Sequence, residues 1–120
     1  MRDKYSADGR EIHEECGVFG VYGVANASNY AYYALHSLQH RGQQGCGIVT
    51  TGDGKNLKIV KGAGLVHEIF NGENLSALNG NIAIGHVRYP TTNIGGMENI
   101  QPFLFRHNTG DFAIAHNGNI

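Results

Sequence analysis

Cys16 stands at an abrupt change of composition and is the residue best placed to do chemistry. It follows the polar segment MRDKYSADGREIHEE and begins the apolar segment CGVFGVYG. A cysteine reacts as its thiolate, so a reactive cysteine needs a base beside it. If the bond between Glu15 and Cys16 is cut, the freed α-amine of Cys16 titrates at about 7.7–8.0 and can act as that base. Position alone also favours another interpretation, a small buried cysteine at the start of a strand.

Three later segments carry polar residues in distinctive order. They are LQHRGQ followed by GCGI over residues 38–48, GHVRYPTT over 85–92, and AHNGN over 115–119. Together with CGVFG they resemble the class II glutamine amidotransferases, which are N-terminal-nucleophile hydrolases. The resemblance covers residues 16–120, and residues 1–15 would be a leader, or propeptide, that is removed.

Within that class, LQHRGQ and HVRYPT are most similar to the amidophosphoribosyltransferase family, the glutamine-using enzymes that open purine synthesis. The sugar-phosphate amidotransferases share the fold but differ around Arg41 and after Arg88. Asparagine synthetases begin with a similar Cys-Gly and resemble the rest of the chain less. Two alternatives stay open: the glutaminase domain of a sugar-phosphate amidotransferase, and a non-catalytic module whose leader is uncut.

The resemblance implies a catalytic role for three residues and a cleavage site before the first of them. Cys16 would be the nucleophile, and cleavage after Glu15 would free its amine as the base. The side-chain amide of Asn117 and the backbone N–H of Gly118 would form an oxyanion hole, because fixed donors stabilise the charge that develops on the carboxamide oxygen. A hairpin turn is the common interpretation of Asn-Gly, and both interpretations can hold at once.

The resemblance also implies substrate-binding residues. Arg88 would bind the α-carboxylate of glutamine, because a guanidinium donates two parallel hydrogen bonds to a carboxylate. Thr91 would line the same pocket, while Arg41 and His86 would brace it. Residues 89–98 would form a lid over the glutamine. The alternatives are a solvent-exposed arginine at a strand end, structural roles for Arg41 and His86, and an ordinary loop.

The implied reaction splits L-glutamine into glutamate and ammonia through a thioester on Cys16. Ammonia would pass to phosphoribosyl pyrophosphate and give 5-phosphoribosylamine. The phosphoribosyltransferase domain, with its Mg²⁺, and the rest of the glutaminase domain would lie outside these 120 residues. The full-length protein is expected to be a homo-oligomer, and this segment does not decide whether it holds an iron–sulfur cluster.

Composition limits the other possibilities. A net charge of −1 with 41% hydrophobic and 16% charged residues is typical of a globular domain and does not indicate a nucleic-acid or membrane surface. Two cysteines without a CxxC pair fit the reducing cytoplasm and no common zinc motif. His36 and His40 lie one helical turn apart without a third ligand, so a helix surface is predicted there. Cys46 lies in an apolar run and is predicted to be an inert core residue.

The elements that must position these residues follow from periodicity. Strands are predicted over residues 17–23, 46–51, 57–61, 81–89, 103–106 and 111–116. A helix capped by Asn26 or Ser28 is predicted over 29–40, with Ala31, Ala34, Leu35 and Leu38 buried; shorter helices are predicted over 65–70 and 73–78. Gly17, Gly20 and Gly23 predict a close backbone approach to the first strand. Segregated helices and strands indicate an α+β fold with antiparallel sheets, and the resemblance implies a four-layer α/β/β/α sandwich, present here in part.

Overall fold

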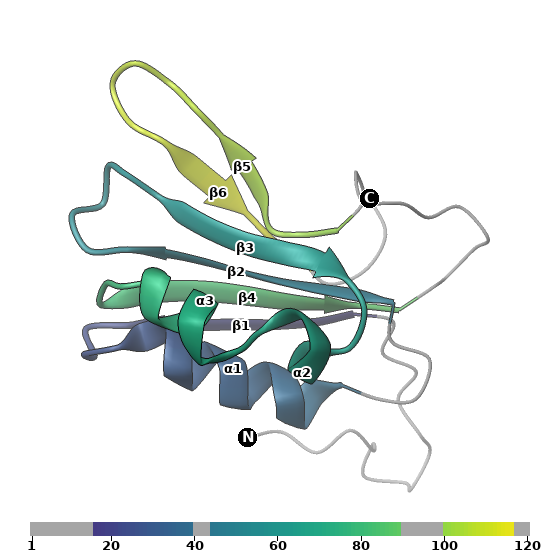
Figure 1. Ribbon diagram of the computed structural model, residues 1–120. Coiled ribbons are helices and arrows are strands. Elements are labelled where there is room, and N and C mark those ends of the chain that lie inside the picture. The colour runs from purple at the N-terminus through teal and green to yellow at the C-terminus, as the bar shows by residue number, and fades with distance from the viewer. Residues whose placement is uncertain (1–15, 40–43, 90–99, 117–120) are drawn as a thin grey trace, which may run out of the picture.

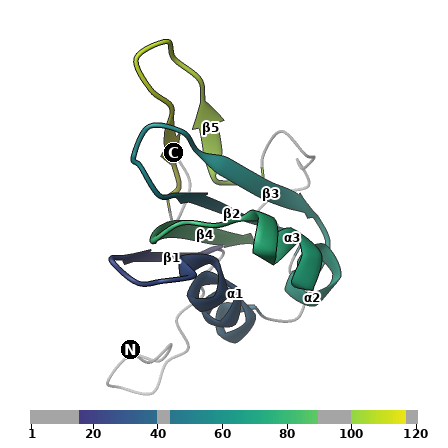
Figure 2. The same cartoon turned by 60° about the vertical axis from the view of Figure 1, so that its left-hand side comes forward.

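The computed structural model describes residues 16–39, 44–89 and 100–116. Its larger sheet is antiparallel and has the order β1 (Cys16–Tyr22), β4 (Ile82–Arg88), β2 (Gly45–Thr51), β3 (Lys58–Ala63). A second antiparallel pair consists of β5 (Phe103–Phe105) and β6 (Phe112–Ile114). Helices α1 (Ala27–Leu38), α2 (Val66–Ile69) and α3 (Gly72–Ala77) cover one face of the larger sheet. The β5–β6 pair lies on the other side and extends beyond the β3 edge (Figures 1 and 2).

The predicted elements are confirmed, each with bounds within two residues of the expected ones. The predicted antiparallel α+β arrangement is confirmed as well. Asn26 is the N-cap residue of α1, as one of the two predicted candidates, but the expected side-chain hydrogen bond is not formed among the described residues. The helix begins after Asn26, whose backbone is left-handed at φ 54° and ψ 52°, and within the described part of the chain its side chain makes no capping hydrogen bond. Ser28 is already inside the helix, and its Oγ donates to the Leu75 carbonyl at 3.1 Å.

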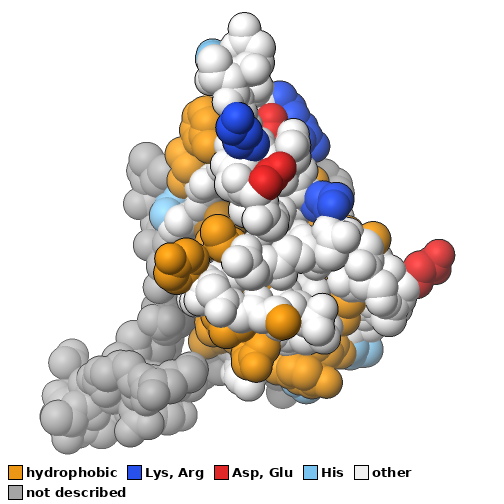
Figure 3. Space-filling model, turned by 90° about the vertical axis from the view of Figure 1, so that its left-hand side faces the viewer, with side chains coloured by type: hydrophobic (Ala, Val, Ile, Leu, Met, Phe, Trp, Pro, Cys, Tyr) orange, Lys and Arg blue, Asp and Glu red, His pale blue; other side chains and the backbone are white. Residues whose placement is uncertain are grey.

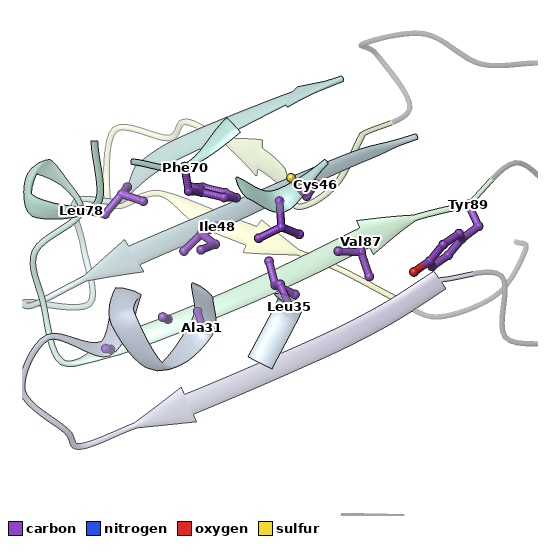
Figure 4. Packing of buried hydrophobic residues seen from close by; sticks show 11 residues of the cluster. Ala31, Leu35, Cys46, Ile48, Phe70, Leu78, Val87 and Tyr89 are labelled. Atoms are coloured by element: carbon purple, nitrogen blue, oxygen red, sulfur yellow. The ribbon is translucent and has the colours of Figure 1, made fainter. Parts of the chain in front are cut away.

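The hydrophobic core fills the space between the helices and the larger sheet (Figure 4). Helix α1 buries Ala31 and Leu35 completely, one turn apart, while the predicted partners Ala34 and Leu38 are half-buried. Small residues let the helix approach the sheet closely: a Cβ added at Gly85 would lie 3.0 Å from Leu35 Cδ1. The other members of the cluster are Ala27, Cys46, Ile48, Val66, Phe70, Leu78, Ala83, Val87 and Tyr89.

A segment that runs into β5 crosses the opposite face of the sheet at Gly47. A Cβ at this position would collide with the Gln101 carbonyl oxygen and lie 3.0 Å from Pro102 Cδ. Lys61, which is opposite Gly47 in the β2–β3 register, donates from Nζ to the Ile100 and Pro102 carbonyls at 2.7 and 3.2 Å. The glycine therefore provides the space, and the lysine provides the hydrogen bonds, that hold residues 100–102 against the sheet.

The close backbone approach predicted for the first strand is not found there. A Cβ at Gly17 would contact side chains, Val87 Cγ2 at 3.0 Å and Leu38 Cβ at 3.1 Å, and the nearest atom to one at Gly20 would be 3.9 Å away. A Cβ at Gly23 would meet no atom within 4 Å among the described residues. Close backbone contacts occur instead at Gly47, where a Cβ would collide with the Gln101 carbonyl oxygen, and at Gly80, where a Cβ would collide with the Thr51 carbonyl oxygen.

One end of the molecule exposes large aromatic side chains. Tyr22, Tyr30 and Tyr33, from the end of β1 and from α1, are 81%, 54% and 68% exposed. Figure 3 shows hydrophobic side chains gathered over the part of this end where α1 lies, whereas the charged side chains gather toward the β5–β6 hairpin. Among the described residues, no helix has the length and apolar character needed to span a membrane.

We predict that Gly47→Ala destabilises the full-length protein by about 1–3 kcal/mol, the usual cost of forcing extra volume into packed structure. The neighbour it meets is a backbone carbonyl, which cannot move aside as a flexible side chain does. Chemical denaturation measures the free energy of unfolding. The matched control is Gly20→Ala, in the same sheet with ordinary contact distances; it should be neutral or stabilising by up to about 1 kcal/mol. Equal stabilities for the two variants would show that residues 100–102 are not tightly packed on β2.

Candidate functional site

The register of the larger sheet places the predicted nucleophile beside a predicted substrate ligand. Cys16 begins β1 and is directly opposite Arg88, which ends β4. On its other side Arg88 is opposite Gly45 of β2. Opposed residues of antiparallel strands have Cα atoms about 4.5–5.5 Å apart. Cys16 and Arg88 therefore lie side by side at one end of the sheet, although they are far apart in the sequence.

His86 lies two residues before Arg88 on the same face of β4, since side chains alternate along a strand. Its ring is completely buried, and Nε2 lies 3.1 Å from the carbonyl oxygen of His116. A carbonyl oxygen only accepts, so Nε2 carries the proton and donates. Burial lowers the pKa of His86 to about 4, with a smaller contribution from the nearby positive charge of Arg88. The ring is neutral at pH 7 and contacts the backbone of the residue before Asn117.

Sequence reasoning missed Gln101. Its side chain is buried, and its Oε1 accepts a hydrogen bond from the backbone N–H of His116 at 2.8 Å. Both backbone polar groups of His116 are therefore bound by side chains, the N–H by Gln101 and the carbonyl by His86. One signal could have identified Gln101: it is a polar residue between Ile100 and Pro102-Phe103 in an otherwise apolar run.

Several predicted site residues lie outside the described residues: Glu15, Arg41, Thr91, Asn117 and Gly118. The backbone of Cys16 belongs to β1, and His116 is the described residue that directly precedes Asn117. Nearly all of the predicted lid is also outside the described ranges. Its first residue, Tyr89, is buried, and its hydroxyl donates to the Leu38 carbonyl at 2.8 Å (Figure 4). The chain entering the predicted lid is thus fixed to the end of α1.

Cys46 lies on the other face of the sheet from Arg88 and His86. It is opposite Val87 in the register and is completely buried in the hydrophobic cluster (Figure 4). Its Sγ is 3.9 Å from the Gly64 carbonyl. The prediction that Cys46 is a core residue is confirmed.

No described residues form a group of three or more His, Cys, Asp or Glu that could hold a metal ion. The Mg²⁺ that the resemblance implies for the phosphoribosyltransferase domain stays a prediction. His36 is exposed on α1, as predicted, and His40 lies outside the described residues. Two surface hollows beside the start of α1 share Asn26 and Asn29; they lie toward the other end of β1 from Cys16.

Comparison with known proteins finds close relatives, although no family model matches the chain. It is 55% identical over 115 residues to the amidophosphoribosyltransferase of Bacillus subtilis, covering 95% of this chain and 24% of that protein. It is 50% identical over 113 residues to the chloroplastic amidophosphoribosyltransferase 1 of Arabidopsis thaliana, covering 94% of this chain and 20% of that one. The solved glutamine phosphoribosylpyrophosphate amidotransferase of B. subtilis, in complex with ADP and GMP, superposes with a TM-score of 0.75 at 54% identity, over 85% of this chain and 22% of that one. The chain thus spans about a quarter or less of the length of these relatives.

The buried ring of His86 predicts that acid destabilises the full-length protein. Its pKa is 6.5 when unfolded and about 4 when folded, so the unfolded state binds the proton more tightly. The resulting stability is fully present above pH 6.5 and is lost as the pH falls toward 4. A difference of one between folded and unfolded pKa corresponds to about 1.36 kcal/mol, so the complete loss is about 3 kcal/mol.

Denaturation at a series of pH values measures this loss, and NMR titration of labelled histidine measures the pKa directly. His86→Gln keeps an N–H donor but cannot titrate, so it should remove this part of the pH dependence. A His86 pKa near 6.5 in the folded protein would contradict the prediction.

Proposed function

We propose that this chain, which belongs to the amidophosphoribosyltransferase family, carries the N-terminal part of a glutamine-hydrolysing domain in which Cys16 is the nucleophile. The observation that carries the proposal is the register that sets Cys16 opposite Arg88. A thiolate source and a carboxylate-binding guanidinium on adjacent strands match the two ends of glutamine. In the full-length protein, the ammonia would pass to phosphoribosyl pyrophosphate in a separate phosphoribosyltransferase domain; a solved relative is named as a glutamine phosphoribosylpyrophosphate amidotransferase.

The chemistry begins with the Cys16 thiol, whose proton moves to the free α-amine of the same residue. The sulfur then bonds to the carboxamide carbon, and the π-electron pair of that group moves to its oxygen. Asn117 and Gly118 would donate to this oxyanion and stabilise it. Collapse of the intermediate breaks the C–N bond, and the protonated amine returns its proton to the leaving nitrogen, which departs as ammonia. Water hydrolyses the resulting thioester to glutamate and restores the thiol.

Cleavage of the leader is part of this proposal. While Glu15 is joined to Cys16, the nitrogen of Cys16 is an amide and has no basic lone pair. Cleavage converts it to an amine that titrates at about 7.7–8.0, close to physiological pH. The leader, residues 1–15, would therefore keep the precursor inactive. The cut can be made by the protein itself, through attack of the Cys16 thiol on the Glu15 carbonyl and hydrolysis of the thioester that forms.

Arg88 would bind the α-carboxylate of glutamine while its γ-carboxamide reaches Cys16. The guanidinium is carried on a half-buried strand end, where a charged hydrogen bond is stronger than in bulk water. Burial lowers the pKa of His86, two residues away, and keeps its ring neutral, and the Arg88 charge acts in the same direction. The positive charge of Arg88 is therefore available for the substrate carboxylate, with no second charge from His86.

We predict that Cys16→Ala abolishes glutamine-dependent synthesis in the full-length enzyme and leaves ammonia-dependent synthesis unchanged. The substitution removes the nucleophile but not the step that consumes ammonia. Intact-protein mass spectrometry should show that the active wild-type protein begins at Cys16. A glutamine-like alkylating reagent, followed by peptide mapping, should label Cys16.

Cys46→Ala is the matched control, because Cys46 lies in the core on the other face of the sheet. It should lower stability and keep glutamine-dependent turnover. Labelling at Cys46 would move the nucleophile to that residue. Full glutaminase activity from protein that still begins at Met1 would falsify activation by cleavage.

We predict that Arg88→Lys raises the KM for glutamine by about 10- to 100-fold, the equivalent of losing a charged hydrogen bond worth about 1.5–3 kcal/mol. Lysine keeps the charge and loses the two-pronged geometry. Glutamine-dependent and ammonia-dependent synthesis are measured in parallel, and only the first should change. Arg106→Lys is the control, since Arg106 is an exposed arginine paired with Asp111 on the β5–β6 hairpin. An equal fall in both activities would remove Arg88 from the glutamine site.

A further inference from the structure

We propose that His86 and Gln101 are positioning residues that hold the backbone of His116 from two sides and thereby set the place of Asn117 and Gly118. The inference rests on the proposed glutaminase function, in which those two residues form the oxyanion hole. It assigns Gln101 a role that its sequence context did not reveal. It also gives His86 a function that acts through the backbone of its neighbour and not through the substrate.

The two hydrogen bonds to His116 lie just beyond the end of the β5–β6 pairing. Strand β6 pairs with β5 as far as Ile114, which is opposite Phe103. Two residues later, the N–H of His116 donates to Gln101 Oε1 at 2.8 Å, and its carbonyl accepts from His86 Nε2 at 3.1 Å. Side chains thus replace the ladder bonds that a longer strand would have made. They act on the residue covalently joined to Asn117.

Both side chains are anchored to the sheet that carries Cys16 and Arg88. His86 is completely buried in β4, which lies between β1 and β2. The Gln101 backbone rests on Gly47 of β2, and Lys61 of β3 binds the carbonyls on either side of it. The position of His116 is therefore set by contacts with the same sheet that carries Cys16.

Positioning of this kind matters because oxyanion stabilisation depends on geometry. Loss of a single oxyanion donor costs about 100- to 1,000-fold in turnover, and a displacement of about 1 Å in a site can cost about 100-fold. In the described part of the chain, the side chains of His86 and Gln101 hold the carbonyl and the N–H of His116, the residue before Asn117. Nε2 can donate to the His116 carbonyl in the neutral and in the charged ring, and the low pKa of His86 means that the ring adds no second charge beside Arg88.

The test uses two pairs of variants in the full-length enzyme. Gln101→Met and His86→Leu keep the approximate size and remove the hydrogen bond, whereas Gln101→Glu and His86→Gln keep an acceptor and a donor respectively. We expect the first pair to lower glutaminase kcat by about 10- to 100-fold, within the range for displaced donors. Their KM for glutamine and their ammonia-dependent synthesis should stay close to wild type. The second pair should recover most of the kcat.

Alkylation of Cys16 by iodoacetamide distinguishes positioning from general disturbance. In that reaction the thiolate sulfur bonds to carbon, the carbon–iodine bond breaks and iodide leaves, so no oxyanion forms. The rate of Cys16 labelling, followed by peptide mapping, should match wild type in Gln101→Met and His86→Leu. A fall in labelling as large as the fall in kcat would overturn the proposal, because the variants would then have disturbed the nucleophile itself.

Asn117→Ala separates this inference from the proposed function. If Asn117→Ala lowers kcat and Gln101→Met and His86→Leu do not, the positioning role is wrong and the glutaminase function stands. If Asn117→Ala keeps full kcat, the oxyanion assignment itself fails. Within the double variant Gln101→Met/Asn117→Ala, a positioning role predicts a loss well below the product of the two single losses. Independent, multiplying losses would overturn it.

Two further variants complete the design. Ser28→Ala removes a buried hydrogen bond to Leu75 on the helical side of the sheet and should lower stability without lowering kcat. If Gln101→Met does not fold, Gln101→Asn is used in its place. It shortens the side chain by one methylene, which moves the acceptor away from the His116 N–H, and it keeps a polar amide. The same loss of kcat with unchanged Cys16 labelling is expected of it, and normal kcat would overturn the proposal.

Discussion

Strand β4 lies between β1 and β2, and the hydrogen bonds of this pairing fix the register on which the candidate site depends. The register aligns the end of β4 with the start of β1 and thus sets Arg88 opposite Cys16. A slip of one residue would turn every side chain of β4 to the wrong face of the sheet. It would place His86 in the hydrophobic core and expose Val87 to the polar side. The core and the site therefore enforce the same register.

The two faces of β4 contact different parts of the molecule, because side chains alternate along a strand. Ala83, Gly85 and Val87 meet α1, where burial of apolar surface stabilises the fold. His86 and Arg88 point to the other face, where the β5–β6 hairpin lies. A sheet that is covered on both sides can hold a neutral histidine and a partly buried arginine next to each other without opening its core to water.

The β5–β6 hairpin is attached to the larger sheet at two places. Near the site, Lys61 of β3 and His86 of β4 bind the backbone on either side of the hairpin. Near its tip, the Asp111 N–H donates to the Lys55 carbonyl at 2.8 Å, and the Asp111 carboxylate accepts from the Leu57 N–H and pairs with Arg106. These contacts lower the pKa of Asp111 although burial opposes them. Attachment at two separated points restricts rotation of the hairpin about either one.

Local sequence patterns predicted the helices, the strands and the antiparallel α+β class, and short motifs predicted the family resemblance. Those properties follow from local periodicity, turn residues and short motifs, each of which involves a few neighbouring residues. Asn26 was a predicted cap of α1 and is its N-cap residue, but its backbone is left-handed and its side chain makes no capping hydrogen bond among the described residues. Three contacts could be recognised only in the folded chain. Cys16 is opposite Arg88, Gly47 leaves space for residues 100–102, and the His116 N–H donates to Gln101. These contacts join residues far apart in the chain, and their partners are set by strand order and register, which no local pattern of residue types encodes.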